Sequence, residues 1–388
     1  MQAEDSVGIR SFFASSLLWN VALGAAFIAV PLHAREVGLA DAQIGLLLAL
    51  PVILQLCLSL VAGALADQLG GKMIAALACL LTALGSIAFW LAETFISLLF
   101  AQLVLVLGRA TFWPATWALA SKLPGDKLAH LGRMNACTNA GQILGTSASG
   151  LILAWLSFGG AFISMSVMAM LALWLNQRVR IVETPSGKGF GATMASYPIL
   201  LRDRRLLRSI ACGAVSALPI ALSFSFFPIL LTAQGYAVAI AGILIALRPI
   251  GSISGSLLAA RLRRALRHRL TPCVAAIAVG LAIALSASGL APHYVALSML
   301  VLGLASSLLS VFVQMEVTDA TPLEMRGAAM ALINVGWALC LLCVPMSMGW
   351  LSQWLGMPSG FYVIAVLAIA VGLVFGWRSS AALSVTAA

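Results

Sequence analysis

Long apolar runs separated by short polar stretches repeat along almost the whole chain. Each run has about twenty residues, which is the length that an α-helix needs to cross a bilayer at about 1.5 Å per residue. The pattern predicts twelve transmembrane helices, with cores at residues 12–32, 43–66, 73–92, 95–121, 133–156, 159–177, 209–232, 237–260, 270–290, 293–315, 328–353 and 359–377. The longest polar stretch follows the sixth run and covers residues 179–208.

The composition agrees with this pattern. With 62% hydrophobic and 9% charged residues, the chain cannot bury its apolar surface in one soluble core. The run from Phe12 to Leu32 is as long as a full span, and no small-residue cleavage site follows it. We therefore expect it to be the first transmembrane helix rather than a signal peptide. The sequence predicts an all-α, multi-pass membrane protein in contact with the lipid bilayer.

The basic residues predict the orientation of the helices. All except Arg35, Arg109 and Arg248 fall on one side of the predicted membrane, which is 19 of the 22 Lys and Arg residues. Because basic loops remain in the cytoplasm, we expect both termini to be cytoplasmic and the protein to lie in a bacterial cell inner membrane. This topology explains the net charge of +10, so we expect no nucleic-acid partner.

The residues that carry enzyme chemistry form no recognisable site. All seven cysteines lie within predicted spans, where they are expected to be small buried hydrophobes. Cys340 and Cys343 have C-x-x-C spacing, but they lie in an apolar helix that offers nothing to lower a thiol pKa. The four histidines are scattered. We expect no enzymatic activity, no cofactor and no metal ion.

The polar stretch Gly63–Lys72, between the second and third runs, reads GALADQLGGK. Its glycines permit a sharp reversal between two helices. The stretch resembles the loop motif between helices 2 and 3 of the major facilitator superfamily, with matches at Gly63, Leu65, Asp67, Gly70 and Lys72. Gln68 and Gly71 stand where the family has basic residues. A generic cytoplasmic hairpin is the alternative interpretation.

This resemblance implies a monomer with the major facilitator fold, in which two pseudo-symmetric six-helix bundles enclose a substrate cavity near the bilayer midplane. The expected domains are residues 1–178, a cytoplasmic linker at 179–208 that contains an amphipathic stretch, and residues 209–388. An internal similarity supports two repeats: Leu60–Leu65 aligns with Leu257–Leu262, and Pro51 then falls next to Pro249.

The same resemblance implies a cytoplasmic gate. We predict that Asp67 lies near the start of the eleventh helix, where backbone N–H groups favour an anion. Arg133 and Arg326 are its candidate cationic partners. The predicted gating residues are Gly63, Asp67, Gly70, Lys72, Arg133, Arg326 and the three glycines of the fifth helix, Gly141, Gly145 and Gly150.

The fifth predicted helix contains Gly141–Gly150, which reads GQILGTSASG. This segment resembles the helix 5 signature of the family's drug antiporters, with Thr146 and Ser149 in place of a proline and a glycine. Without the family, the same glycines predict close helix packing. A stripe of polar side chains on one helical face is expected to line an aqueous cavity or the contact between the halves; it consists of Asn135, Asn139, Gln142 and Thr146.

Two arginines lie deep in predicted spans. Arg109 resembles the basic residue of the family's helix 4 motif, although Phe112 and Trp113 replace two motif residues, and Arg248 lies in the eighth helix. No acidic residue is central to a span, so an anionic or neutral substrate is favoured over a cation. Either arginine could instead be structural. The candidate substrate-binding residues are Arg109, Arg248, Asn20, Gln55, Asn139, Gln142, Asn334 and Trp113.

Three functions follow from these patterns. The leading hypothesis is proton-coupled efflux of a small organic compound by alternating access, because the fifth helix resembles that of the antiporters. The alternative is uptake or exchange of a small organic anion, which the two arginines favour. A non-transporting membrane receptor or channel is disfavoured, because two matched halves serve alternating access.

Overall fold

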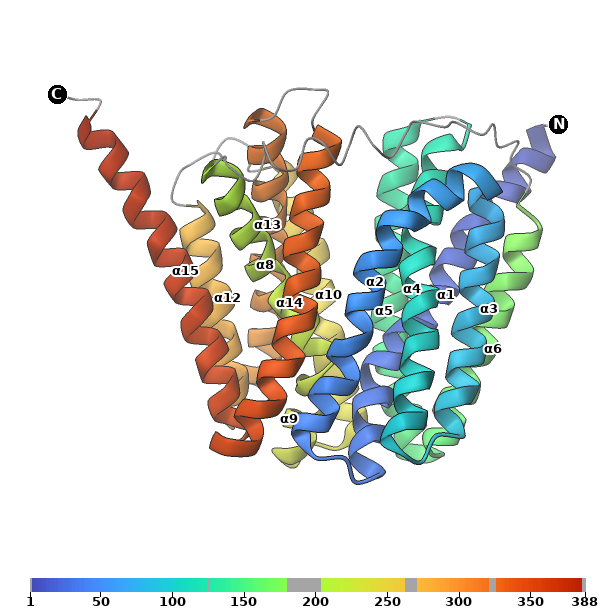
Figure 1. Ribbon diagram of the computed structural model, residues 1–388, viewed down its shortest axis with the longest axis horizontal. Helices are drawn as coiled ribbons and strands as arrows, with labels where there is room; N and C mark the ends of the chain where they lie inside the picture. Colours follow the sequence, from blue (N-terminus) through green and yellow to red (C-terminus); the bar gives the residue numbers. More distant parts are fainter. Residues whose placement is uncertain (1, 125, 180–203, 262–270, 321–325, 386–388) are drawn as a thin grey trace. The chain divides into compact units, whose positions relative to one another are not determined.

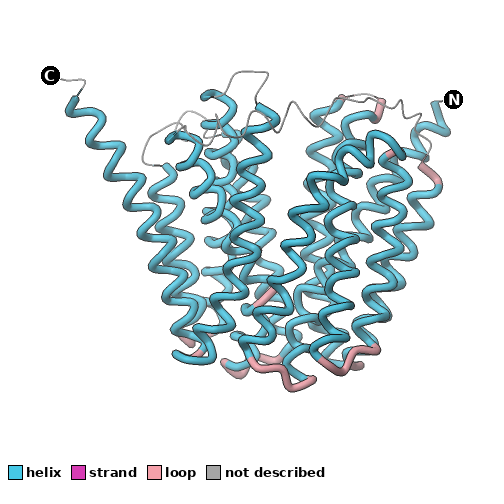
Figure 2. Tube along the Cα trace, in the orientation of Figure 1, coloured by secondary structure: helices cyan, strands magenta, loops and turns pink. Residues whose placement is uncertain are grey.

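The computed structural model describes residues 2–124, 126–179, 204–261, 271–320 and 326–385, and these residues form α-helices with no strand among them (Figure 2). The first six helices, blue to green in Figure 1, are α1 (Gln2–Glu36), α2 (Asp41–Leu69), α3 (Gly71–Trp90), α4 (Phe95–Lys122), α5 (Lys127–Trp155) and α6 (Phe158–Gln177). The later helices are α8 (Arg204–Ser223), α9 (Phe226–Ala233), α10 (Val238–Arg261), α12 (Thr271–Ala287), α13 (Pro292–Ala320), α14 (Arg326–Leu355) and α15 (Met357–Val385).

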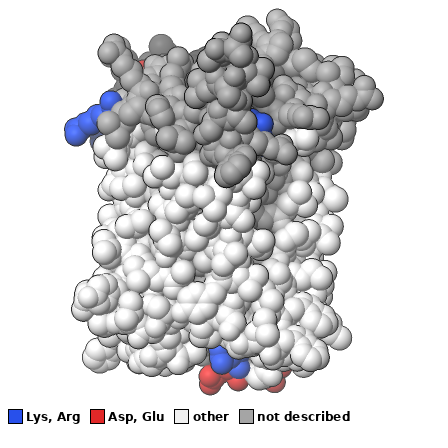
Figure 3. Space-filling view, turned by 90° about the vertical axis from the view of Figure 1, so that its left-hand side faces the viewer, with Lys and Arg blue, Asp and Glu red and all other residues white. Residues whose placement is uncertain are grey.

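Each predicted span coincides with helical structure, and the all-α fold class is confirmed. Within the described residues, 10 helices are long and apolar enough to cross a membrane. Of the other predicted spans, α12 is apolar but shorter, and α5 contains the polar stripe noted above. One face of the molecule carries no described Lys, Arg, Asp or Glu across its broad middle band (Figure 3). This distribution of charge suits a protein surrounded by lipid.

The seventh predicted span, residues 209–232, is helical but broken in two. The helix is interrupted: α8 ends at Ser223 and α9 begins at Phe226. Pro228 has no N–H, so it cannot donate to the carbonyl of Phe224 four residues earlier. A proline is tolerated in the first turn of a helix, where its N–H has no partner to lose. The position of Pro228 is therefore compatible with a new helix that begins at Phe226.

The described chain divides into two compact units. The first contains residues 1–188 and 224–246, and the second contains residues 189–223 and 247–388. In the first unit α1 packs against α5 and α6, α3 against α4 and α6, and α2 against α4. In the second, α8 packs against α13 and α14, and α12 against α13 and α15. These units differ from the predicted halves mainly in residues 224–246, which group with the first unit; α9 contacts α1 there.

The predicted reversal between the second and third helices is a turn of one residue. Gly70 separates α2 from α3 and has φ 88° and ψ 134°, a conformation that side chains with a Cβ rarely adopt. A Cβ on the next residue, Gly71, would lie 2.9 Å from Leu119 Cγ and 3.1 Å from the Ala115 carbonyl oxygen. The two glycines thus allow both the reversal and the close contact of α3 with α4.

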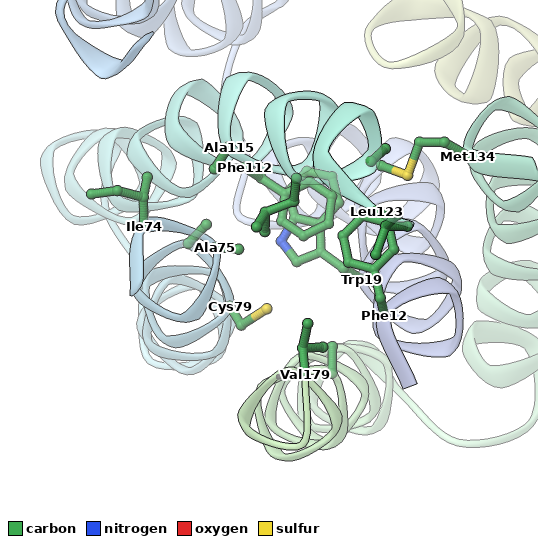
Figure 4. Packing of buried hydrophobic residues seen from close by; sticks show 14 residues of the cluster. Phe12, Trp19, Ile74, Ala75, Cys79, Phe112, Ala115, Leu123, Met134 and Val179 are labelled. Atoms are coloured by element: carbon green, nitrogen blue, oxygen red, sulfur yellow. The ribbon is translucent and has the colours of Figure 1, made fainter. Parts of the chain in front are cut away.

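The core of the first unit is built around one aromatic stack. Trp19 of α1 lies against Phe112 of α4, with ring centroids 3.7 Å apart and an interplanar angle of 8° (Figure 4). Both side chains are fully buried. The Trp19 indole Nε1 donates a hydrogen bond of 3.0 Å to Thr82 Oγ1 of α3. This one residue therefore connects three helices and positions the faces of α1 and α4 that meet at the site described below.

The hydrogen bond of Trp19 can be tested separately from its packing. Trp19→Phe should keep an aromatic ring against Phe112 but lose the bond to Thr82, which costs about 1 kcal/mol. We expect a lower thermal midpoint of the purified protein. In a double-mutant cycle, Thr82→Val should add little to the effect of Trp19→Phe. Fully additive losses would contradict the coupling of the two side chains.

Candidate functional site

The first unit contains a small, partly open cavity between its helices. Its volume is about 30 Å³, which is room for about two water molecules. Its walls come from α1, α2, α3, α4 and α6 and from the residue that follows α8. The lining residues are Trp19, Ala22, Leu23, Ala26, Phe27, Val30, Leu48, Thr82, Gln102, Leu105, Val106, Arg109, Met165 and Phe224. Most of this wall is apolar or aromatic, so the few polar groups dominate its chemistry.

Arg109 supplies the only charged side chain among the lining residues of this cavity. Its Nε donates a hydrogen bond of 3.0 Å to Gln55 Oε1 of α2. Its guanidinium carbon lies 5.6 Å from the centre of the Phe224 ring, which is within the range of a cation–π interaction. The side chain as a whole is partly buried, but its Nη2 is buried and has no hydrogen-bond partner within the described residues. Two of the candidate substrate-binding residues, Arg109 and Gln55, thus lie within hydrogen-bonding distance of each other.

Two of the lining residues that the sequence did not predict, Gln102 and Phe224, bear on the chemistry of Arg109. Gln102 lies seven residues before Arg109, on the same face of α4, and its side chain is 5% exposed. This spacing within an apolar run could have identified it. Phe224 follows the end of α8 and reaches Arg109 only because the seventh helix is interrupted. No local pattern in the sequence indicates that contact.

Two glycines of the fifth-helix signature, Gly141 and Gly145, allow α5 to touch α1. A Cβ on Gly145 would collide with the Val21 carbonyl oxygen and would lie 2.8 Å from the Ala25 nitrogen. A Cβ on Gly141 would lie 2.5 Å from Asn20 Cβ. Both sites therefore need glycine, which is the close packing that the sequence predicts.

The third glycine, Gly150, contacts a different helix of the same unit. A Cβ there would lie 2.8 Å from the Val238 carbonyl oxygen and 3.1 Å from Gly242 Cα of α10. Thr146, which occupies the family's proline position, donates its Oγ1 to the Gln142 carbonyl oxygen at 2.8 Å. A proline at 146 would remove an N–H from that same carbonyl. The Thr146 hydroxyl thus donates to the Gln142 carbonyl oxygen, the same group that would lose a backbone hydrogen bond if residue 146 were proline.

Several predicted substrate residues lie away from the cavity wall. Asn20 is fully buried, and its Nδ2 donates to the Ser16 carbonyl oxygen at 2.8 Å. Asn139 donates to the carbonyl oxygen and to Oδ1 of Asn135, at 2.9 and 3.2 Å. Gln142 is 5% exposed. The polar stripe of α5 is absent from the lining of this cavity, so its predicted role stays a prediction.

Trp113 lies beside the aromatic stack rather than in the cavity wall. Its ring meets that of Trp19 edge-on, with centroids 5.8 Å apart.

The second unit contains the other candidates. Arg248 of α10 is buried, with 6% of its surface exposed, and its carbonyl oxygen accepts a hydrogen bond of 3.2 Å from Ser252 Oγ. A Cβ on Gly303 of α13 would collide with that carbonyl, so α10 and α13 pack closely here. Asn334 of α14 is exposed. Each arginine is thus described within its own unit, and their joint role stays a prediction.

The predicted gate is described only in part. Lys72 Nζ donates to the Gln177 carbonyl oxygen at 2.9 Å, and Asn176 Nδ2 donates to the Lys72 carbonyl oxygen at 2.9 Å. These bonds join the start of α3 to the end of α6, where a cation is favoured by the helix dipole. Arg133 is exposed on α5. The side chains of Asp67 and Arg326, and the surroundings of Gly63, lie outside the described residues.

The curated relatives include a transporter named for drug resistance. The quinolone resistance protein NorA of Staphylococcus aureus is 26% identical over 132 residues, which are 34% of this chain and 34% of NorA. The match thus spans about a third of each protein. The same identity and coverage hold for NorA of strain COL.

The fold has close counterparts among solved structures. The nucleoside transporter NupG has a TM-score of 0.80 at 14% identity, with 95% of this chain and 98% of NupG covered. A bacterial homologue of the human lysosomal transporter Spinster has a TM-score of 0.78 at 15% identity, with 97% and 96% covered. At such identities the likeness shows the fold alone. The family profile of the Major Facilitator Superfamily matches residues 11–339 and again 212–387. This chain belongs to the Major Facilitator Superfamily of membrane transporters.

Proposed function

We propose that the protein is a proton-coupled efflux transporter for a small organic compound that is anionic or neutral rather than cationic. It acts as a monomer in the bacterial inner membrane, with both termini in the cytoplasm. The proposed charge of the substrate rests on one observation, the environment of Arg109. Its guanidinium contacts an amide and an aromatic ring, and no acidic residue lines the cavity. A cationic substrate would be repelled there.

The direction of transport rests on two weaker supports. The fifth helix has close-packed glycines at the positions of the antiporter signature. The partial relative NorA is named for quinolone resistance. Uptake or exchange of a small organic anion is the second candidate. Arg109 and the buried Arg248 favour it, because guanidinium groups bind carboxylates through paired hydrogen bonds.

The direction can be measured without knowing the substrate. Cells that lack the protein should retain more of the exported compound than cells that carry it, and untargeted mass spectrometry of cell extracts would identify that compound. Everted membrane vesicles should then accumulate it when a proton gradient is imposed. A protonophore should abolish this accumulation and serves as the control.

The opposite sign would contradict export. If the compound is depleted in cells that lack the protein, and right-side-out vesicles accumulate it, the uptake hypothesis is correct. A thermal-shift screen of the purified protein with the candidate compounds gives an independent check, because a ligand that binds the native state raises its stability.

A further inference from the structure

Two side chains in the wall of the cavity of the first unit, Arg109 and Gln102, carry hydrogen-bond donors that nothing in the described structure uses. Arg109 Nη2 is buried without a partner. The side chain of Gln102 is 5% exposed, lines the same cavity and makes no hydrogen bond within the described residues. Leaving such groups unsatisfied costs about 1–3 kcal/mol each, and more for a charged group. The pair therefore indicates an occupant that accepts hydrogen bonds.

The charge of that occupant follows from the surroundings of Arg109. The partners of its guanidinium are the neutral Gln55 amide and the Phe224 ring. No Asp or Glu is among the cavity-lining residues. A buried charge is retained when an opposite charge or a set of hydrogen bonds compensates it. Water would supply hydrogen bonds, but an anion would also neutralise the guanidinium.

The size and the donors of the cavity restrict the anion. In this structure the cavity has a volume of about 30 Å³, which suits a small ion but is too little for a whole organic substrate. An organic substrate could reach Arg109 only in a conformation with a wider cavity. The other polar groups are already engaged, since Trp19 Nε1 donates to Thr82 Oγ1 and Thr82 Oγ1 donates to the Ala78 carbonyl oxygen. Phosphate or sulfate would need more donors than remain. A single-atom anion with an apolar shell matches the two free donors.

We propose that this cavity is a binding site for a monovalent halide, with chloride as the physiological occupant, held between the guanidinium group of Arg109 and the side-chain NH₂ of Gln102. The site lies inside one unit and requires neither a particular substrate nor a direction of transport, so it goes beyond the proposed function. The carboxylate of an anionic substrate has the same chemistry as a ligand for Arg109. Measuring halide binding to the substrate-free protein distinguishes a site for chloride from a site for the substrate carboxylate.

The test uses the full-length protein, purified in detergent and exchanged into sodium gluconate. Chloride or bromide then replaces gluconate at constant ionic strength, and both the thermal midpoint and the binding of radioactive chloride are measured. We expect saturable binding and a rise in the midpoint, because a ligand of the native state stabilises it. The proposal would be overturned if the thermal midpoint were the same in chloride as in gluconate and no saturable binding of chloride were found. Water alone would then fill the cavity.

Variants locate the site. Gln102→Leu removes one donor while keeping the shape of the side chain, so chloride should bind about tenfold more weakly. Arg109→Gln removes the charge and should abolish saturable binding. Arg178→Gln is the matched control: this exposed arginine lies over Trp174, 3.7 Å from the centre of its ring, and chloride binding should be unchanged.

Two results would contradict this location. One is unchanged chloride affinity in Gln102→Leu, which also decides the matter if Arg109→Gln does not fold. The other is anomalous scattering from bromide in crystals of the protein that places the ion away from Arg109.

Discussion

Replacing Gly145 by valine should prevent stable packing of α5 against α1. The added Cβ would collide with the Val21 carbonyl oxygen and would lie 2.8 Å from the Ala25 nitrogen and 3.0 Å from Gly24 Cα. These three atoms belong to the backbone of α1, so no side-chain rotation relieves the overlap. Valine adds two further methyl groups to the same contact. We expect a loss of about 3 kcal/mol or more, seen as a large drop in the thermal midpoint and in the yield of monodisperse protein.

Gly132 is the matched control, because it lies in the same helix but a Cβ there would meet nothing within 4 Å. Gly132→Ala should keep or raise the midpoint, since alanine is favoured over glycine in a helix by about 1 kcal/mol. The thermal midpoint of Gly145→Ala should lie between those of Gly145→Val and Gly132→Ala. A Gly145→Val protein with the wild-type midpoint would show that the helices can separate at no cost, and the packing explanation of the helix 5 signature would then be wrong.

Much of the fold was predictable because lipid imposes a strong and simple constraint. A membrane helix satisfies its own backbone groups and needs about twenty apolar residues, so the runs of the sequence determine where helices lie. The turn at Gly70 was predictable for a similarly local reason, since only glycine adopts its φ of 88° readily. Close packing at Gly141 and Gly145 also follows from residue type, because removal of a side chain is what lets two helices touch.

The cavity was only partly predictable, because its wall depends on contacts between distant segments. Arg109 and Gln55 were both candidate residues, and a hydrogen bond joins them. The place of Phe224 depends on a broken helix whose second part packs with the first unit. Hydropathy does not reveal this break, because residues 209–232 taken together are apolar enough to predict a single span, in spite of Ser223 and Ser225. Asn20 is an opposite case. Its amide within a predicted span made it a candidate for a substrate cavity, but its side chain is fully buried beside Gly141.

The second large effect is expected at Arg109, where Arg109→Gln should abolish any preference of the transporter for carboxylates. The test follows identification of a transported compound by the export assay. Proteoliposomes that contain the wild-type protein are challenged with pairs of competitors that differ only in a carboxylate or its amide. If Arg109 binds the anionic group, the wild type should prefer the carboxylate by about 10- to 100-fold. In Arg109→Gln this ratio should fall to about one.

Arg109→Lys separates charge from geometry. The guanidinium donates from Nε to Gln55 and has further N–H donors in the same plane, whereas a lysine ammonium is a point charge without this planar fork. The lysine variant should therefore keep a reduced preference for carboxylates. Arg178→Gln serves as the control and should keep the full ratio, because that exposed side chain lies outside the cavity. If Arg109→Gln also keeps it, the anionic group binds elsewhere, and the same series at the buried Arg248 becomes the decisive measurement.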